Sequence, residues 1–257
     1  MAPAGGCAFR KPLLKWHLTL EVDPTVADRD AVVLKTVKVL ENRLHAWGVK
    51  NFRLTPQHAG RILLDMSAES DPERLKSLIT TGGKLELMHV ISPPSPAPVQ
   101  TFPTKDEAIA SLKSDGSIPA DRRVLPYSER DDPPASAVDI PKIFKWVVVE
   151  SPAIVDGSSI RNASAVLSRG DNYEIPFSLD KPGGEKVGAW TRANVNEYLS
   201  VVLNDKVKSI AFIKSQITDS GVISGSFTKA MAEDLALVLN SGALPATIKI
   251  ADERIDK

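Results

Sequence analysis

Residues 221–250, GVISGSFTKAMAEDLALVLNSGALPATIKI, restrict the fold more than any other segment of the chain. Gly221 and Gly225 interrupt an apolar run that includes Ile223 and ends at Phe227. Glycines inside a strand pattern mark bulges, or places where another group approaches the backbone closely. The run therefore predicts a short strand with a bulge or a tight contact.

A helix is expected to follow this strand. Thr228 is suited to be its N-cap, because a threonine hydroxyl accepts a hydrogen bond from the first helical turn. Gly242 suits a left-handed residue after the helix, and Pro245 prevents the helix from continuing. A closing strand is then predicted at 247–250. The apolar positions that share one face of this helix are Met231, Leu235, Val238 and Leu239.

The first ninety residues show the order strand, helix, strand, strand, helix, strand. Apolar residues at helical spacing predict a first helix that ends at Gly48, and Pro72 is placed in the first turn of a second helix. This β-α-β-β-α-β order is the ferredoxin-like plan. Alternating apolar residues predict its strands at 16–22, 52–55, 62–66 and 85–90.

The last third of the chain can be interpreted in the same way, with one extra strand. A strand at 173–179 and a helix at 184–192 precede a hairpin around Asn204-Asp205, and the C-terminal elements follow. We therefore predict an α+β fold: a duplicated ferredoxin-like (βαββαβ) base sheet with helices on one face and an inserted head subdomain. Two independent α+β domains are the alternative that periodicity leaves open.

The middle of the chain contains proline-rich stretches and an irregular apolar pattern, and it is expected to be the inserted head. The predicted division is 12–91 for the first half of the base, 92–170 for the head, and 171–252 for the second half of the base. The segment SPPSPAP favours extended, stiff backbone at the first crossing. The hinge candidates at the two crossings are Pro93, Pro94, Pro96, Pro98 and Gly170.

Composition and motifs exclude several functions. Lys+Arg and Asp+Glu balance at 32 each, which argues against a broad nucleic-acid-binding face. No apolar run approaches the roughly 18 to 20 residues that span a bilayer. The histidines His17, His45, His58 and His89 lack metal-ligand spacing, and no phosphate-binding glycine motif is present. We therefore expect no enzymatic activity, no cofactor, no metal and no nucleic acid partner.

Several motifs, in the same order, resemble the first periplasmic domain of SecD, a membrane subunit that assists protein export. They are E-N-R-L-H-A-W-G-V at 41–49, T-G-G-K-L-E-L at 81–87, G-x-I-x-G-x-F at 221–227 and S-G-A-L-P-A at 241–246. The family's G-L-D-L-x-G-G signature is absent, because residues 9–15 are FRKPLLK. The residues that the resemblance marks as structural are Arg43, Gly48, Gly221, Gly225, Phe227, Gly242, Leu244 and Pro245.

The resemblance implies a non-enzymatic, periplasmic domain on the outer side of a bacterial inner membrane. Its expected partners are an unfolded preprotein and, through membrane helices that this sequence lacks, the Sec translocon and a SecF-like subunit. The domain would help to drive or retain the preprotein outside the membrane. An excised ectodomain is favoured over a divergent soluble paralogue. The alternative function is a soluble ferredoxin-like enzyme or a small-molecule-binding sensor domain, for which the same plan is used.

Overall fold

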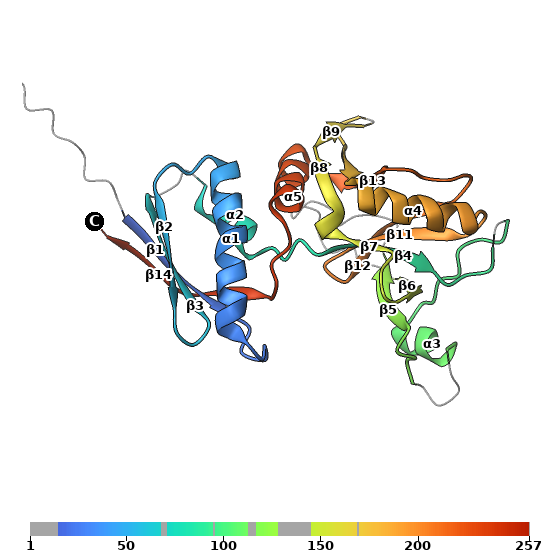
Figure 1. Ribbon diagram of the computed structural model, residues 1–257, viewed down its shortest axis with the longest axis horizontal. Coiled ribbons are helices and arrows are strands. Elements are labelled where there is room, and N and C mark those ends of the chain that lie inside the picture. Colours follow the sequence, from blue (N-terminus) through green and yellow to red (C-terminus); the bar gives the residue numbers. More distant parts are fainter. Residues whose placement is uncertain are drawn as a thin grey trace, which may run out of the picture. The chain divides into compact units, whose positions relative to one another are not determined.

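The chain forms two compact units in the computed structural model, which describes residues 15–67, 71–94, 96–112, 117–127, 145–168 and 170–256. The first unit comprises residues 1–81 and 245–257, and the second comprises residues 82–244. Both mix helices and strands, so the predicted α+β class is confirmed (Figure 1). None of the described helices is long and apolar enough to cross a membrane.

The first unit contains one antiparallel sheet of order β14-β1-β3-β2. The prediction that residues 85–90 complete this sheet is wrong. The C-terminal strand β14 takes the edge position instead and pairs with β1 along the whole length of β1. The elements are β1 (Lys15–Val22), α1 (Arg29–Trp47), β2 (Phe52–Gln57), β3 (Arg61–Ser67), α2 (Pro72–Thr80) and β14 (Ile248–Asp256).

Both helices of the first unit cover the same face of this sheet (Figure 1). Alternate residues of β1 and β3 point to that face and are buried, as the period of two requires. The opposite face carries polar residues such as His17 and Asp65. The buried strand residues are Trp16, Leu18, Leu20, Val22, Ile62, Leu64 and Met66.

The second unit contains two sheets. In the smaller sheet β10 lies between β13 and β8, and β9 also pairs with β10. Its strands are β8 (Ile160–Ala163), β9 (Val166–Leu167), β10 (Tyr173–Leu179) and β13 (Ser220–Phe227). The larger sheet contains β4 (Leu85–Val90), β5 (Arg122–Tyr127), β6 (Lys145–Glu150), β7 (Val155–Asp156), β11 (Tyr198–Leu203) and β12 (Lys206–Phe212).

The larger sheet closes into a five-stranded ring. Its pairing order is β11-β12-β5-β6-β4, and β4 pairs with β11 again, while β7 attaches to β4. Among the described residues of this unit, the helices are α3 (Lys105–Ala110), α4 (Lys181–Ala193) and α5 (Lys229–Ser241), and a 3-10 turn lies at Gly157–Ser159.

The predicted second copy of the ferredoxin-like plan is therefore wrong. Its strands are shared among three sheets: β10 and β13 pair in the smaller sheet, β11 and β12 belong to the ring, and β14 belongs to the first unit. The physical reason is that β4 and β11 are buried on both faces, so neither can lie in a sheet that is covered on one side only. Pairing between the two flanks of the chain does occur, in the β1–β14 and β4–β11 ladders.

Strands β4 and β11 separate two hydrophobic cores of the second unit. One core lies inside the ring and includes Met88, Val90 and Val202. The other lies between the ring and the smaller sheet. It contains Leu85, Leu87, Ile175, Phe177, Leu179, Val187, Leu199, Val201, Ile223, Phe227, Leu235 and Leu239.

The predicted hinge residues lie inside the second unit. Ala97 is attached to the ring, because the Tyr198 hydroxyl donates to its carbonyl at 2.6 Å. Gly170 follows β9 with a φ of +63°. Because the contacts divide the chain at 81/82 and 244/245, the expected boundaries at 91/92 and 170/171 do not separate compact units. A hinge at Pro93, Pro94, Pro96, Pro98 and Gly170 stays a prediction.

Candidate functional site

Helix α4 is the central element of the candidate site. Asp180 is its N-cap and accepts a hydrogen bond from the backbone N–H of Gly183 at 2.8 Å. Pro182 lies in the first turn, where its missing N–H has no cost. Helix α4 contacts both β10 and β7, so it lies along the smaller sheet and the edge of the ring.

Glycines let the loop after β12 approach α4 closely. A Cβ on Gly184 would lie 2.8 Å from the carbonyl oxygen of Thr218, and one on Gly188 would lie 2.9 Å from the Gln216 side-chain amide. The buried Thr191 hydroxyl accepts from the N–H of Ile217 at 2.9 Å and donates to the carbonyl of Val187. The loop therefore lies directly against the helix and is hydrogen-bonded to it through the Thr191 side chain.

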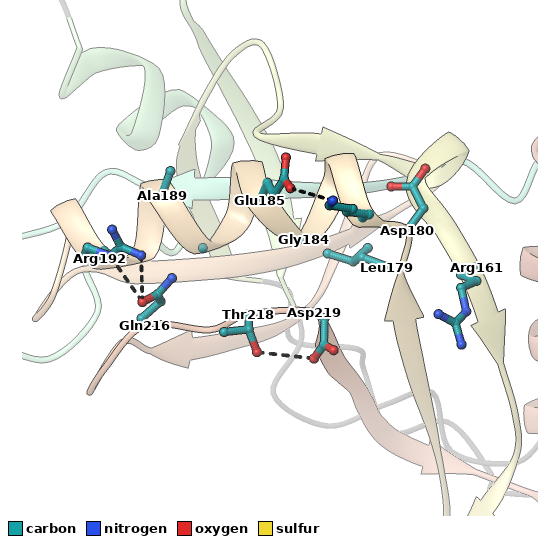
Figure 2. Close-up of a pocket in the computed structure, with 12 residues that line it drawn as sticks. Arg161, Leu179, Asp180, Gly184, Glu185, Ala189, Arg192, Gln216, Thr218 and Asp219 are labelled. Atoms are coloured by element: carbon teal, nitrogen blue, oxygen red, sulfur yellow. Dashed lines mark hydrogen bonds and ion pairs between the residues drawn. The ribbon is translucent and has the colours of Figure 1, made fainter.

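A first hollow of about 470 Å³ lies between α4, β8 and this loop (Figure 2). Several of its polar side chains pair with one another. Arg192 donates to Gln216 at 3.1 and 3.2 Å, and Lys181 forms an ion pair with Glu185 at 4.0 Å. Arg161 reaches the hollow from β8 on the other side (Figure 2). This hollow is a polar surface rather than a set of groups that converge on one point.

A second hollow of about 580 Å³ lies on the other side of α4. Its apolar part is formed by Pro152, Ile154, Ala189 and Trp190, with Glu150 and Lys186 as its charged members. The Trp190 ring packs against His89 with centroids 5.1 Å apart. Ala189 lines both hollows, so α4 forms the ridge between them.

A substitution in α4 tests whether the glycines are required by close packing. Gly184→Ala is expected to lower the free energy of unfolding by about 1 to 3 kcal/mol, because the new methyl group meets a backbone carbonyl that cannot move freely. In an exposed helix the same change would raise stability by roughly 0.5 to 1 kcal/mol. The sign of the change in the free energy of unfolding, measured by urea titration, therefore shows whether close packing requires Gly184.

Gly188→Ala is the matched control for this test. Its nearest neighbour is the end of a flexible glutamine side chain, which can move aside. We expect it to be clearly less damaging than Gly184→Ala. Equal losses for the two variants, or a gain in stability for Gly184→Ala, would contradict the proposed packing.

The residues marked by the family motifs support the fold and lie outside both hollows. Arg43 is fully buried, and its Nη1 donates to the carbonyls of Leu78 and Thr81 at 2.8 and 2.5 Å. Burial lowers the pKa of Arg43 to about 10. Gly48 ends α1 with a φ of +96° in the left-handed region, as predicted.

The C-terminal motif is also structural. A Cβ on Gly221 would lie 2.5 Å from the Phe177 ring, and Gly225 lies where the β10–β13 register shifts, so both predicted strand features are present. Gly242 has the expected positive φ of +91°, but its ψ of 161° is extended rather than left-handed helical. Leu244 is buried and donates to the carbonyl of Gly82, and Pro245 follows at the crossing into the first unit.

The predicted apolar face of α5 needs one correction. Met231 is 44% exposed, whereas Leu235 is 8% exposed. Ala232 and Ala236 are buried in addition to the predicted residues. The helix therefore buries a face rotated away from Met231, because small alanines allow α5 to lie close to β8 and β10.

Sequence reasoning missed the residues that line the two hollows. The glycines Gly183, Gly184 and Gly188 were the available signal, since three glycines in one helix are costly unless a neighbour lies close. Nothing local in the sequence identified Trp190 as the partner of Pro152 and Ile154, which come from another part of the chain. In the described ranges no group of histidine, cysteine or carboxylate side chains has metal-site geometry.

Comparisons with known proteins agree with this architecture. The family model for the SecDF P1 head subdomain matches residues 136–246, which lie almost entirely in the second unit. SecD of Koribacter versatilis is 32% identical over 228 residues, covering 88% of this chain and 39% of that protein. SecD of Aquifex aeolicus is 29% identical over 227 residues, covering 88% of this chain and 40% of that protein.

Two solved structures share the fold. SecDF in its super-membrane-facing form has a TM-score of 0.67 at 24% identity, over 95% of this chain and 30% of that chain. A structure of SecDF, a membrane component that enhances protein export, has a TM-score of 0.64 at 24% identity, over 92% of this chain and 98% of that chain.

The fold thus defines a two-unit α+β domain of the type found in SecDF. The resemblance found in the sequence motifs is confirmed, and the chain is related to protein translocase subunit SecD, in the region of its periplasmic domain. It spans about two fifths of the length of the two SecD relatives named above.

Proposed function

We propose that this chain is the extracytoplasmic, preprotein-engaging part of a SecD-like translocase subunit. The observation that carries the proposal is the apolar hollow beside Trp190, which lies in the unit that the head-subdomain family matches. Membrane segments of the whole protein would connect it to the Sec translocon and to a SecF-like subunit. Its place would then be the periplasmic side of the inner membrane.

The second hollow has properties that suit an unfolded polypeptide. Pro152, Ile154 and Trp190 offer apolar surface to a client side chain, and Trp is a frequent anchor in binding surfaces. Glu150 and Lys186 carry opposite charges, so the hollow does not present charge of one sign only. Ordering an unfolded client costs entropy, which keeps such binding weak and reversible.

A non-enzymatic role is part of the proposal. The first hollow is polar, but Arg192 and Gln216 bond to each other, and Lys181 pairs with Glu185 (Figure 2). An enzyme or a small-molecule sensor would direct such groups at one ligand. The arrangement therefore favours a binding surface for polypeptide over the alternative of an enzyme or sensor.

Binding of an unfolded polypeptide tests this proposal. The probe is a fluorescently labelled, permanently unfolded preprotein segment, titrated with the chain and followed by fluorescence anisotropy. Trp190→Ala is expected to weaken binding roughly fivefold or more, as removal of an interface anchor does. Because Trp190 also packs against His89, Ala189→Glu serves as a second variant: its exposed position places a charge on the ridge at the edge of this hollow without altering the core.

Met231→Ala is the control, since Met231 is an exposed apolar side chain on another helix. It should leave the affinity unchanged. Absence of binding by the unaltered chain, or equal affinity in the Trp190→Ala and Ala189→Glu variants, would refute the assignment of this hollow. A saturable small-molecule ligand found in a thermal-shift screen would instead favour the sensor alternative.

A further inference from the structure

A histidine on the open face of the first unit bridges three neighbouring strands. His17 of β1 lies opposite Asp65 of β3 in the antiparallel register, and its Nδ1 is 2.5 Å from Asp65 Oδ1. Its Nε2 is 3.0 Å from Oδ2 of Asp256, on β14. The ring is only partly exposed, with 27% of the side-chain surface accessible. One imidazole thus connects β3, β1 and β14.

The protonation state of this ring decides whether both contacts are favourable. A neutral imidazole has one N–H donor and one acceptor nitrogen, while the imidazolium donates from both. With a carboxylate at each nitrogen, only the cation makes two hydrogen bonds, and both are strengthened by charge. The bond to Asp65 raises the pKa of His17 above 6.5, and Asp256 adds to this rise against the opposing effect of burial.

Two arginines on this face stand opposite members of the cluster. Arg254 stands opposite His17 in the β1–β14 register, and its Nε donates to Asp252 at 2.8 Å. Arg53 of β2 stands opposite Asp65 on the far side of β3. Neither is among the groups that shift the pKa of His17.

The cluster matters because it helps to hold the edge strand β14 on the sheet. β14 is an edge strand that pairs with β1 alone, and its register shifts between Thr19 and Leu20. Residues 252–256, beyond the shift, are all exposed. On the helix-covered face Glu253 accepts from the Trp16 indole and from Lys76. On the open face, the contact between His17 and Asp256 is a side-chain link that joins β14 to β1.

We propose that His17, Asp65 and Asp256 form a proton-dependent clasp that fastens the C-terminal half of β14 to the sheet of the first unit. β14 is the strand in which the chain returns to the first sheet after the second unit. Protonation of one side chain therefore controls how firmly this return strand is held. The clasp is independent of the proposed role in preprotein binding.

The direction of the effect follows from the raised pKa. The folded state binds the proton more tightly than the unfolded state, so the clasp contributes fully below pH 6.5. Its contribution is lost as the pH rises through the pKa of folded His17. Acid therefore fastens the strand and alkali loosens it.

Hydrogen exchange of the intact chain tests the clasp. Amide exchange at residues 252–256 is measured by mass spectrometry between pH 5.5 and 8.5, with correction for the intrinsic pH dependence of exchange. In the unaltered chain, local opening is expected to become roughly two- to fivefold more frequent across this range, the size typical of an exposed ion pair. His17→Gln should open at the higher frequency at every pH.

His58→Gln is the matched control, because His58 is an exposed histidine in the turn between β2 and β3. It should keep the pH dependence, whereas Asp256→Asn should reduce it. NMR titration of the His17 ring gives a second readout that does not depend on the variants folding. A midpoint for His17 at or below 6.5, or an unchanged pH dependence in His17→Gln, would overturn the proposal.

Discussion

Leu235→Ala is expected to lower the free energy of unfolding of the second unit by about 2 to 5 kcal/mol. Leu235 lies on the buried face of α5, in the core that the helix shares with β10, β13 and the ring strands. Truncation removes apolar contacts and leaves a cavity. Neighbours such as Ile175 and Phe177 are fixed on strands and can fill that cavity only partly.

Urea titration of the intact chain gives the measurement, with Trp146 and Trp190 as fluorescent reporters inside the second unit. Met231→Ala on the same helix is the control and should cost less than about 0.5 kcal/mol, because that side chain is largely exposed. A loss below about 0.5 kcal/mol for Leu235→Ala would mean that α5 buries a different face.

Arg43→Met is expected to destabilise the first unit by roughly 2 to 4 kcal/mol. The guanidinium is fully buried and donates to the carbonyls of Leu78 and Thr81, at the C-terminal end of α2. Methionine keeps much of the volume but cannot donate, so the buried carbonyl of Leu78 and the partly buried carbonyl of Thr81 lose this donor. The burial that lowers the pKa of Arg43 to about 10 opposes the charge, which limits the net loss.

Fluorescence of Trp16 and Trp47 in the first unit provides the signal for this variant. Arg53→Met is a control of the same chemistry on an exposed position of β2, and it should change stability by less than about 0.5 kcal/mol. A change below about 1 kcal/mol for Arg43→Met would show that water or other donors satisfy the two carbonyls.

The candidate site depends on contacts that local sequence does not encode. Trp190, Pro152 and Ile154 meet only because α4 lies beside the segment that follows β6. The glycines of α4 carry a partial signal, since their cost in a helix implies a close neighbour. That neighbour, the carbonyl of Thr218, becomes known only when the loop after β12 is placed.

Local structure was determined by the sequence itself. The stop of α1 at Gly48, the irregular strand around Gly225 and the helix after Thr228 follow from backbone preferences and hydrogen-bond needs of a few adjacent residues. The family motifs can be recognised in the sequence, but Arg43 and Gly221 act through distant partners: Arg43 donates to the Leu78 and Thr81 carbonyls, and Gly221 lies against the Phe177 ring.

Tertiary structure alone decided which strand pairs with which. Residues 85–90 and 248–256 both have strand character, and either could follow α2 in the ferredoxin-like plan. β4 is buried on both faces, whereas β14 is largely exposed on its outer side. In the folded chain β4 packs against apolar residues on both faces within the second unit, which the first sheet could not provide. β4 therefore belongs to the ring, and β14 takes the edge position of the first sheet.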